Sequence, residues 1–301
     1  MLENLRRKSL VKTYHDPIHQ VCFEQGLAKY GKHIEIDVCT QKLSKELQEN
    51  LFQKAIDTIS KEGFSFFKLT MIYCPKGTFT MGHIDQEDNQ PRKKKIDRPF
   101  LLGETEITQE LYEKVMGENP SLSQNDSQKP VEWVSWVDAI LFCNELSRLQ
   151  GLDECYTENP KSRDHGWDCD FSKNGYRLPE EKEWEYAAKA GTENKYAGTN
   201  QLADLSKYAW FREDWQTGTT HPVKTKKPNE WGFYDMSGNV REWCWDKYDP
   251  KDRDISANRV IRGGSCGYDA SHLRSARRFG NSPDYCSDGG LGFRVCRSFV
   301  N

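Results

Sequence analysis

The sequence predicts an α+β fold in which irregular loops take up much of the chain. Three observations predict it: only a few segments show clear helical periodicity, the strand candidates are short, and strands and helices do not alternate regularly. The connections are long and rich in turn residues and tryptophan. Because such long connections are uncommon in compact domains unless they carry function, we expect functional loops.

Residues 1–66 differ in pattern from the rest and are expected to form an N-terminal appendage, partly helical, that packs on a main domain of residues 67–301. Within it, "LSKELQENLFQKAIDTISKEG" (43–63) repeats apolar residues on one helical face, and Gly63 can end the helix. The start of the chain has basic residues without a following apolar core, so it does not read as a leader peptide.

Three helices are expected in the main domain, each with start or stop signals. They are 107–120 with Thr108 as its N-cap and Gly117 at its end, 135–151 with Ser135 as its N-cap, and 178–191 with Pro179 at its first position and Gly191 at its end.

Short strands are expected at 63–73, 98–107, 259–264 and 291–300. The charge run "RKKK" (92–95) reads as a solvated loop and not as a nucleic-acid patch, since no stacking aromatic residues are interleaved with it. Tryptophans in "VEWVSW" and "REWCW" are expected to tie the loops to the core through their polar tips.

Composition and charge exclude several classes of protein. The chain is 36% hydrophobic and 12% aromatic, enough for a core, and its net charge of −3 creates no overall field that attracts nucleic acid or anionic lipid. No apolar run approaches the roughly 20 residues needed to span a bilayer. The ten cysteines include no C-x-x-C pair, and we expect most of them to be buried thiols.

Six ordered motifs carry a resemblance to a known family. They are "FTMGHIDQEDNQPRKKKIDRPFLLGETEITQELYEKV", "PVEWVSWVDAILFCNELS", "YRLPEEKEWEYAAKAG", "NEWGFYDMSGNVREWCWDKY", "RVIRGGS" and "LRSARR" followed by "GLGFRV". From about residue 67 to 301 the chain resembles the formylglycine-generating-enzyme or sulfatase-modifying-factor domain. That resemblance implies a C-type lectin-like fold, while one fold hosts many functions.

The enzymes of this family oxidise a substrate cysteine with copper and oxygen, and they carry a thiol pair shortly after the "GGS" segment. Here Cys266 follows Ser265, but the stretch up to His272 holds no second thiol, and only Cys286 further on could approach it. Two thiolates suit Cu(I). A copper-dependent oxidase is therefore an alternative function, and the missing thiol favours a protein without catalytic activity.

Two further metal sites follow from resemblance. The sulfoxide synthases of the family add an iron-binding helical domain, which invites comparison with His15, His19 and Glu24, but Pro17 interrupts that pair and we interpret these histidines as surface residues. The loop "SGNVREW" resembles the calcium-associated loop of the family. Asn239 and Glu242 are then candidate ligands of a structural calcium, the alternative being that Asn239 makes a turn and Glu242 pairs with an arginine.

The C-terminal segment has an unusual composition. Residues 252–301 contain no Lys, Glu, Gln, Trp or Met, although Arg and Asp remain plentiful. These five types are the ones that no codon ending in a pyrimidine encodes. Asparagine codons with randomised adenines would leave this absence. The segment thus resembles the variable proteins of diversity-generating retroelements, in which adenine-directed mutagenesis alters a C-terminal repeat, here about 259–297.

A surface that tolerates wholesale substitution cannot also form the core, where substitutions typically cost about 2–5 kcal/mol. We therefore expect the residues of the recognisable motifs to form the core and the turns, and the residues of the irregular stretches between them to face solvent. The expected core set is Arg262, Gly263, Gly264, Leu273, Arg274, Ala276, Gly292, Phe293 and Val295. The expected ligand-binding set is Cys266, Gly267, Tyr268, Asp269, His272, Arg278, Phe279, Gly280, Asp284, Tyr285, Ser287, Asp288 and Gly289.

The rings of Tyr268, Phe279 and Tyr285 are expected to anchor a ligand, because such rings supply contact area at low entropic cost. The predicted function is a non-catalytic receptor or adhesin-like binder that requires no cofactor. Its expected partner is a protein on a host or neighbouring cell, with no nucleic acid and no direct membrane insertion. An inert structural envelope protein is a further alternative. The resemblance implies a cell-surface protein anchored by a lipid on a leader outside this chain, and free thiols would also suit a cytoplasm.

Overall fold

A computed structural model describes residues 21–29, 32–35, 65–86, 89–162, 164–212, 220–249, 254, 257–286 and 289–298, with side chains from residue 69 onward. The expected helix at 43–63 and the histidines at 15 and 19 lie outside these residues. So do Ser287 and Asp288 of the expected binding set.

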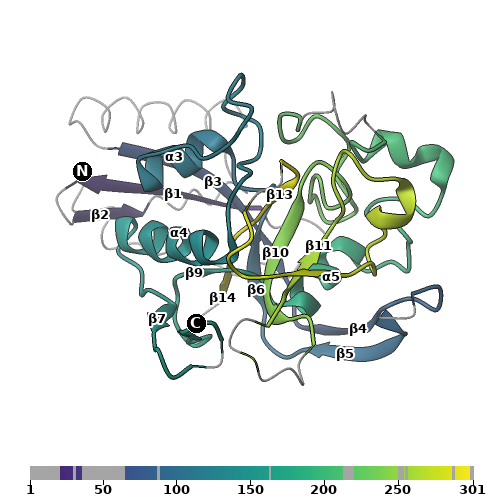
Figure 1. Cartoon of the computed structure of the whole chain (residues 1–301), viewed down its shortest axis with the longest axis horizontal. Helices are drawn as coiled ribbons and strands as arrows, with labels where there is room; N and C mark the ends of the chain where they lie inside the picture. The colour runs from purple at the N-terminus through teal and green to yellow at the C-terminus, as the bar shows by residue number, and fades with distance from the viewer. Residues whose placement is uncertain are drawn as a thin grey trace, which may run out of the picture.

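The largest sheet has six strands in the order β2-β1-β3-β6-β14-β9, and every neighbouring pair is antiparallel (Figure 1). Its strands are β1 (Val21–Lys29), β2 (Lys32–Glu35), β3 (Ser65–Cys74), β6 (Phe100–Gly103), β9 (Tyr176–Arg177) and β14 (Cys296–Ser298). The N-terminal segment, which we expected to be partly helical, therefore contributes two strands that continue the main sheet beyond β3.

A second sheet has the order β12-β11-β10-β13, with β13 parallel to β10, and two ribbons pair β4 with β5 and β7 with β8. The strands are β4 (Gly77–Met81), β5 (Arg92–Ile96), β7 (Tyr156–Glu158), β8 (Trp167–Cys169), β10 (Arg241–Lys247), β11 (Arg259–Arg262), β12 (Phe279–Asn281) and β13 (Leu291–Gly292). Two expectations were wrong. Residues 92–95 form a strand with exposed side chains instead of a loop, and 291–300 forms two short strands that join different sheets.

The helices begin and end close to their expected positions. They are α3 (Gln109–Met116), α4 (Trp136–Leu149), α5 (Glu181–Lys189) and the 3-10 turns η2 (Leu202–Lys207) and η3 (Ala270–Leu273). Thr108 and Ser135 cap α3 and α4 with their side chains, and Gly117 ends α3 at φ 83°. Helix α5 begins after Glu180, so Pro179 lies just outside it, and Ala190 already adopts the left-handed conformation before Gly191.

The β10–β11 pair separates two hydrophobic clusters. Trp243 and Ile261 face a cluster that includes α3 and α4, while Cys244 and Val260 face a cluster that includes α5. Because alternate residues of a strand point to opposite faces, these two strands are buried on both sides and form a rigid centre.

Tryptophan side chains tie this centre to the surrounding loops, as expected. The indole N–H of Trp136 donates to the Cys244 carbonyl oxygen at 3.1 Å, and that of Trp243 donates to the Val134 carbonyl oxygen at 3.0 Å. Each bond joins segments more than a hundred residues apart in the sequence.

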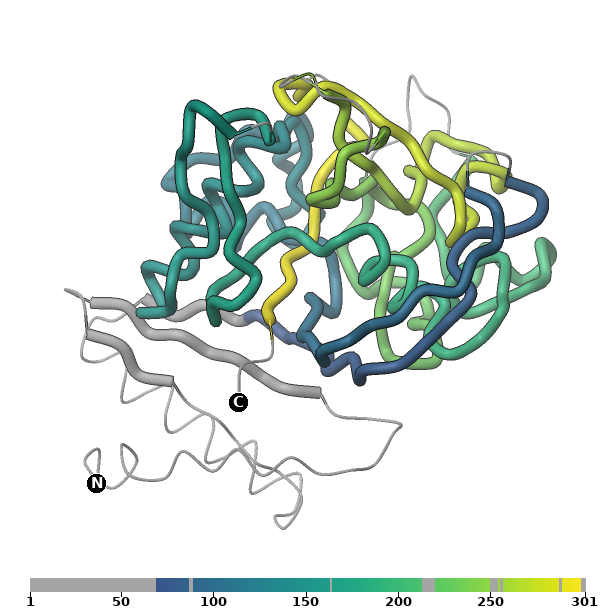
Figure 2. Tube along the Cα trace, turned by 90° about the horizontal axis from the view of Figure 1, so that it is seen from below, coloured from purple at the N-terminus to yellow at the C-terminus, as the bar shows by residue number. Residues whose placement is uncertain are grey.

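The segment after β11 forms one side of the molecule, at the top of Figure 2, whereas β14 lies on the opposite side. The sheet that receives both ends of the main domain is thus remote from these loops. Within the described ranges, every helix is too short or too polar to cross a bilayer.

Candidate ligand-binding surface

The segment 263–290 is held at both ends by the second sheet, since it leaves β11 and returns to β13. Gly263 and Gly264 begin it with φ of 93° and 72°, a conformation that favours glycine. A Cβ atom on Gly264 would lie 2.9 Å from the His272 carbonyl oxygen, so the turn cannot accept a side chain there without moving.

Arg262 anchors the first part of the segment to α5. Its guanidinium is fully buried and donates to the carboxylates of Glu181 and Glu185 and to the Ser275 carbonyl oxygen. A buried arginine with carboxylate and carbonyl partners is compensated for the loss of water. It therefore joins a strand, a helix and the segment rigidly.

Arg294 plays the same part after the segment. Its Nε and Nη2 donate to the two oxygens of Glu242 at 2.6 and 2.7 Å, and its Nη1 donates to the Gly103 carbonyl oxygen at 3.0 Å. Trp184 donates its indole N–H to Glu242 at 2.7 Å. All three side chains of this group are fully buried.

Most residues of the expected core set lie inside, as predicted. Buried are Arg262, Gly263, Gly264, Leu273, Ala276, Gly292, Phe293 and Val295. Arg274 is the exception, because its side chain is 23% exposed and forms an ion pair with Asp85. The Leu273 and Ala276 carbonyl oxygens also accept bonds from Ser237 and Asn89, which fixes the backbone of the first loop.

The structure brings three rings of the expected binding set together. The ring centroids of Tyr268 and His272 are 4.9 Å apart, and Phe279 lies 5.7 Å from each of them. The rings are inclined by only 8° to 24° to one another, and all three are half-buried.

A straight column of three rings would place its outer pair much farther apart than its inner pairs. Here two separations are equal and the third is shorter, so the rings overlap with an offset, the arrangement that aromatic quadrupoles favour. Tyr268 and Phe279 are anchored below, since each packs partly against a hydrophobic cluster. The group is thus a preformed apolar platform and not a set of loose side chains.

Asp269 lies beside the rings and is exposed. It caps η3 by accepting from the Ser271 backbone N–H, and its carboxylate is 3.1 Å from Nδ1 of His272. Hydrogen bonds from Ser271, followed by the contact with His272, lower the pKa of Asp269 to about 2. The surface therefore presents a carboxylate that stays ionised next to an apolar platform.

The second loop adds Tyr285 and Asp284. Tyr285 is half-buried and packs against the larger hydrophobic cluster, while the exposed Asp284 lies 3.0 Å from Nε2 of His165. Gly289 is exposed, and a Cβ atom there would lie 3.7 Å from the indole nitrogen of Trp133. This loop thus borders residues of 132–165 that lie outside the variable segment.

Three residues expected to face a ligand do not do so freely. Cys266 is buried, with 6% of its surface exposed. The Arg278 side chain is 11% exposed and donates to Glu181 and to the Tyr248 carbonyl oxygen, so it belongs with the anchors. Gly280 lies in β12, where a Cβ atom would come within 2.6 Å of the Tyr248 ring.

Sequence reasoning missed several neighbours of the platform. The Arg241 guanidinium of β10 lies 5.3 Å from the Tyr268 ring, and that of Arg277 lies 5.3 Å from the Phe279 ring. Phe211 packs against the same cluster as Tyr268, next to an Arg212 backbone N–H that donates to the Tyr268 carbonyl oxygen. Only chain folding brings these residues together, so no local pattern could have shown them.

The proposed calcium ligands do not fit a cation site. The side-chain oxygen of Asn239 accepts the His221 backbone N–H at 2.9 Å, and its amide donates to the His221 carbonyl oxygen at 3.1 Å. Glu242 is occupied by Arg294 and Trp184, as the alternative interpretation held. Across the described residues, no group of three or more His, Cys, Asp or Glu is placed to hold a metal ion.

Two other carboxyl groups are buried near Glu242. Burial, followed by the charges of Asp235 and Glu242, raises the pKa of Glu106, and burial raises the pKa of Asp235 to about 6. One oxygen of Asp235 is buried without a hydrogen-bond partner. The frame therefore contains acidic groups that are costly to ionise, in contrast to the exposed Asp269.

The described cysteines form no disulfide, and most are buried. Burial raises the pKa of the Cys143, Cys244 and Cys296 thiols, which disfavours the reactive thiolate. Cys266 is buried whereas Cys286 is exposed, so the two thiols considered for copper lie in different environments.

Comparison with known proteins decides the family. The model of the sulfatase-modifying factor enzyme 1-like domain matches residues 66–299. The chain belongs to this family. Its sulfatase-modifying-factor domain has the loop-rich, C-type lectin-like α+β fold that the sequence predicted.

The solved structure of Treponema denticola variable protein 1 is similar, with a TM-score of 0.70 and 36% identity over 77% of this chain and 96% of that one. The chaperone protein LppX of Paenibacillus barcinonensis is 36% identical over 193 residues, 55% of this chain and 68% of that protein. The inactive C-alpha-formylglycine-generating enzyme 2 of Mus musculus is 29% identical over 272 residues, 76% of this chain and 85% of that protein. The family resemblance and the resemblance to a variable protein are both confirmed.

Proposed function

We propose that this sulfatase-modifying-factor domain is a non-catalytic binding protein. Its ligand-binding surface consists of the loops between β11 and β13. The expected ligand is a protein on another cell, bound by aromatic area from Tyr268, His272 and Phe279 and by polar contacts from Asp269 and Asp284.

The half-exposed ring platform on a rigid frame carries this proposal. Rings that are fixed before binding lose little conformational entropy when a ligand packs on them. The frame beneath, from Arg262 through α5 to Arg294, is buried, and both guanidinium groups are paired with buried carboxylates, so substitutions on the outer face of the loops need not disturb it.

The similarity to a protein named as variable supports a diversified surface. The absence of Lys, Glu, Gln, Trp and Met from residues 252–301 points the same way. An inert structural protein would have no reason for either feature.

The environment of the thiols favours binding over copper oxidation. A Cu(I) site of the kind expected in the family needs two thiolates on one metal ion. Burial of Cys266 and exposure of Cys286 do not favour such a pair, and one relative is named as inactive. A surface that binds other cells is useful outside the cell, and we propose that this chain is displayed there on a lipid anchor supplied by a leader.

The deciding test is genetic. We expect a copy of the coding segment for residues 259–297 near the gene. Wherever the copy and the gene differ, the copy should have an adenine. Sibling genes should differ at 268, 269, 279, 284 and 285 and agree at 262, 273, 293 and 294. Siblings that vary equally in both sets would contradict the proposal and favour a structural role.

A biochemical test separates the binder from the oxidase. Cu(I) titration before and after thiol blocking should show no high-affinity site that depends on Cys266 and Cys286. Tight copper binding that disappears in the Cys266→Ser and Cys286→Ser variants alike would favour the oxidase.

A further inference from the structure

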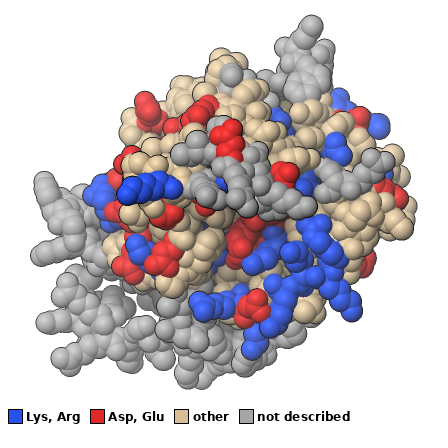
Figure 3. Space-filling model, turned by 60° about the horizontal axis from the view of Figure 1, so that its bottom comes forward, with Lys and Arg blue, Asp and Glu red and all other residues tan. Residues whose placement is uncertain are grey.

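A strip of positive charge lies along the β4–β5 ribbon. It consists of Lys76, Arg92, Lys93, Lys94, Lys95 and Arg98, all of which are exposed. We call this set the basic strip. Figure 3 shows a concentration of Lys and Arg on the face that contains the ribbon.

The described residues neutralise little of this charge. Lys95 forms an exposed ion pair with Asp97 at 2.7 Å, and Arg92 donates to Asn89 at 2.9 Å. In the part of the chain that the structure describes, the side chains of Lys76, Lys93, Lys94 and Arg98 form no hydrogen bond or ion pair. Six cations and Asp97 together give the strip a net charge of +5, although the chain as a whole carries −3.

The strip is presented by a rigid element. Phe79, which pairs with Lys94 and shares its face of the ribbon, packs 5.1 Å from the Tyr186 ring of α5. Lys189 of the same helix donates to the carbonyl oxygens of Thr80 and Gly82. The backbone of the ribbon is thus fixed to the core. Because side chains alternate along a strand, those of Lys93 and Lys95 project from one face of the ribbon and those of Arg92 and Lys94 from the other, and all four are exposed.

Protection of a strand edge does not account for the whole strip. Lysines on an exposed strand discourage pairing with another chain. Lys76 and Arg98, however, lie just outside the two strands and cannot protect their hydrogen-bonding edges. Their addition extends the charge beyond the strand and makes a broader surface.

We propose that the basic strip docks the protein on the anionic phospholipid headgroups of a membrane surface. Clusters of four to eight Lys or Arg residues are typical of such peripheral contacts, which need only a local patch. Nucleic-acid-binding domains are usually basic as a whole and add aromatic rings that stack on bases. This chain has a net charge of −3, and the ring of Phe79 in the ribbon is packed against Tyr186.

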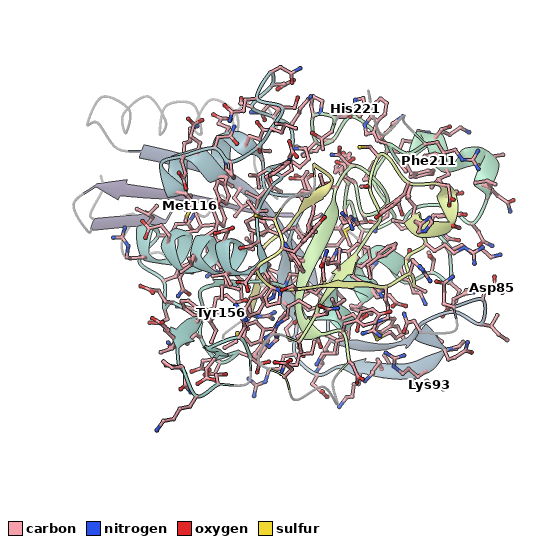
Figure 4. The ribbon with its side chains drawn as sticks, viewed as in Figure 1. Asp85, Lys93, Met116, Tyr156, Phe211 and His221 are labelled. Carbon is pink, nitrogen blue, oxygen red and sulfur yellow. The ribbon has the colours of Figure 1, made fainter. Side chains whose placement is uncertain are left out.

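Docking through the strip leaves the ring platform open. In Figure 4, Lys93 lies at the lower edge of the molecule, whereas Phe211 and His221 lie higher up. Phe211 packs against the same hydrophobic cluster as Tyr268. The membrane contact would thus involve the β4–β5 side of the molecule and leave the ring platform accessible to a ligand. This inference does not depend on the proposed function, since the strip and the platform share no residue.

The test is co-sedimentation with lipid vesicles. The wild-type chain should bind vesicles that contain phosphatidylglycerol at low ionic strength, bind pure phosphatidylcholine vesicles weakly, and be released by salt. The Lys93→Glu/Lys94→Glu/Lys95→Glu variant should lose roughly tenfold or more in partition coefficient, because each lysine near an anionic surface contributes attraction. Lys161→Glu/Lys207→Glu/Lys227→Glu changes the charge equally at exposed sites away from the ribbon and should retain binding.

Equal loss in both variants would show that net charge alone matters and would overturn the proposal. So would failure of the wild-type chain to bind anionic vesicles, or preferential binding of duplex DNA in a parallel titration. Both variants should unfold at the wild-type temperature, since all six lysines are exposed. If the Glu variant unfolds early, the Lys93→Gln/Lys94→Gln/Lys95→Gln variant replaces it and should show a smaller loss in the same direction.

Discussion

The frame arginines Arg262 and Arg294 flank the segment that carries the ring platform, yet polar groups in the two regions have opposite environments. In the frame, Arg262 and Arg294 are fully buried, and their guanidinium groups donate to the buried carboxylates of Glu181 and Glu242. Beside the platform, the exposed Asp269 contacts Ser271 and His272, and in the second loop the exposed Asp284 contacts His165. The difference shows which positions in a variable segment are free to vary.

Energetics explain the contrast. Removing one partner of a buried ion pair leaves an uncompensated charge, whereas an exposed pair contributes roughly 0–1 kcal/mol. A segment can therefore alternate between invariant and variable residues, as long as the side chains of the invariant residues are buried and those of the variable residues are exposed.

The largest expected effect is on Arg294. Replacement by methionine leaves the Glu242 carboxylate buried with Trp184 as its remaining donor, and should reduce the free energy of unfolding by about 3–5 kcal/mol. Urea denaturation measures it. Arg277→Met, at a half-buried site on the platform, should cost less than about 1 kcal/mol. Similar losses for the two variants would contradict the comparison.

Gly280 tests whether the cost of a substitution depends on the position of the residue in the sequence or on its packing in the fold. It lies among irregular residues, but its Cβ position meets Tyr248, so Gly280→Ala should cost about 1–3 kcal/mol through overpacking. A Tyr248→Ala background removes the ring carbons at 2.6 and 2.8 Å but keeps the Cβ of residue 248 at 2.9 Å, so the same change should cost less there but still cost something. A double-mutant cycle of unfolding free energies would detect the difference. An unchanged cost in that background would point to a cause other than the ring.

The pH dependence of stability should separate the two regions further. Burial raises the folded-state pKa of Asp235 to about 6, above the unfolded value of about 3.9. The folded state then binds the proton more tightly, so stability should fall as pH rises from about 4 to about 6. Asp235→Asn should remove this slope and stabilise the protein above that window by about 1–3 kcal/mol.

The matched surface variant is Asp269→Asn. Hydrogen bonds lower the pKa of Asp269 to about 2, so its contribution is present above the unfolded pKa of about 3.9 and is lost as pH falls toward 2. Asp269→Asn should therefore be less stable than wild type above about pH 4, whereas Asp235→Asn should be more stable than wild type above about pH 6. Denaturation midpoints measured across pH compare the two variants. A stability that rises with pH between 4 and 6 in wild type, and no longer does so in Asp235→Asn, would overturn the assignment of Asp235.

The smallest expected effect is at Asp284. Its ion pair with His165 is exposed on the aspartate side, so Asp284→Ala should change the unfolding free energy by less than about 0.5 kcal/mol. Differential scanning calorimetry would show a transition within a degree or two of wild type. A large shift would place this residue in the frame.

Local signals predicted the helices and the fold well. Thr108, Gly117 and Ser135 act as the sequence indicated, because caps depend on only a few neighbouring residues. The strand at 92–95 was missed because four successive cations carry no apolar alternation, although backbone pairing with β4 is independent of side-chain polarity.

The binding surface was only partly predictable. Ring type and position suggested Tyr268 and Phe279, and the structure stacks them. Arg278 and Gly280 were misplaced because their environments depend on Glu181 and Tyr248, and Cys266 because its backbone N–H donates to the Asn239 carbonyl oxygen; these partners are distant in the sequence. Spacing within the segment cannot reveal such contacts.

The entry and exit of 263–290 lie in the same four-stranded sheet, on either side of β10. That geometry makes the segment a closed insert whose length, and not only its composition, is cheap to alter. Each doubling of a flexible loop costs only about 0.6 kcal/mol of closure entropy. The ends of a foreign peptide grafted between Tyr285 and Gly289 would therefore be fixed by the sheet. The domain is thus suited as a scaffold that presents unrelated peptide sequences.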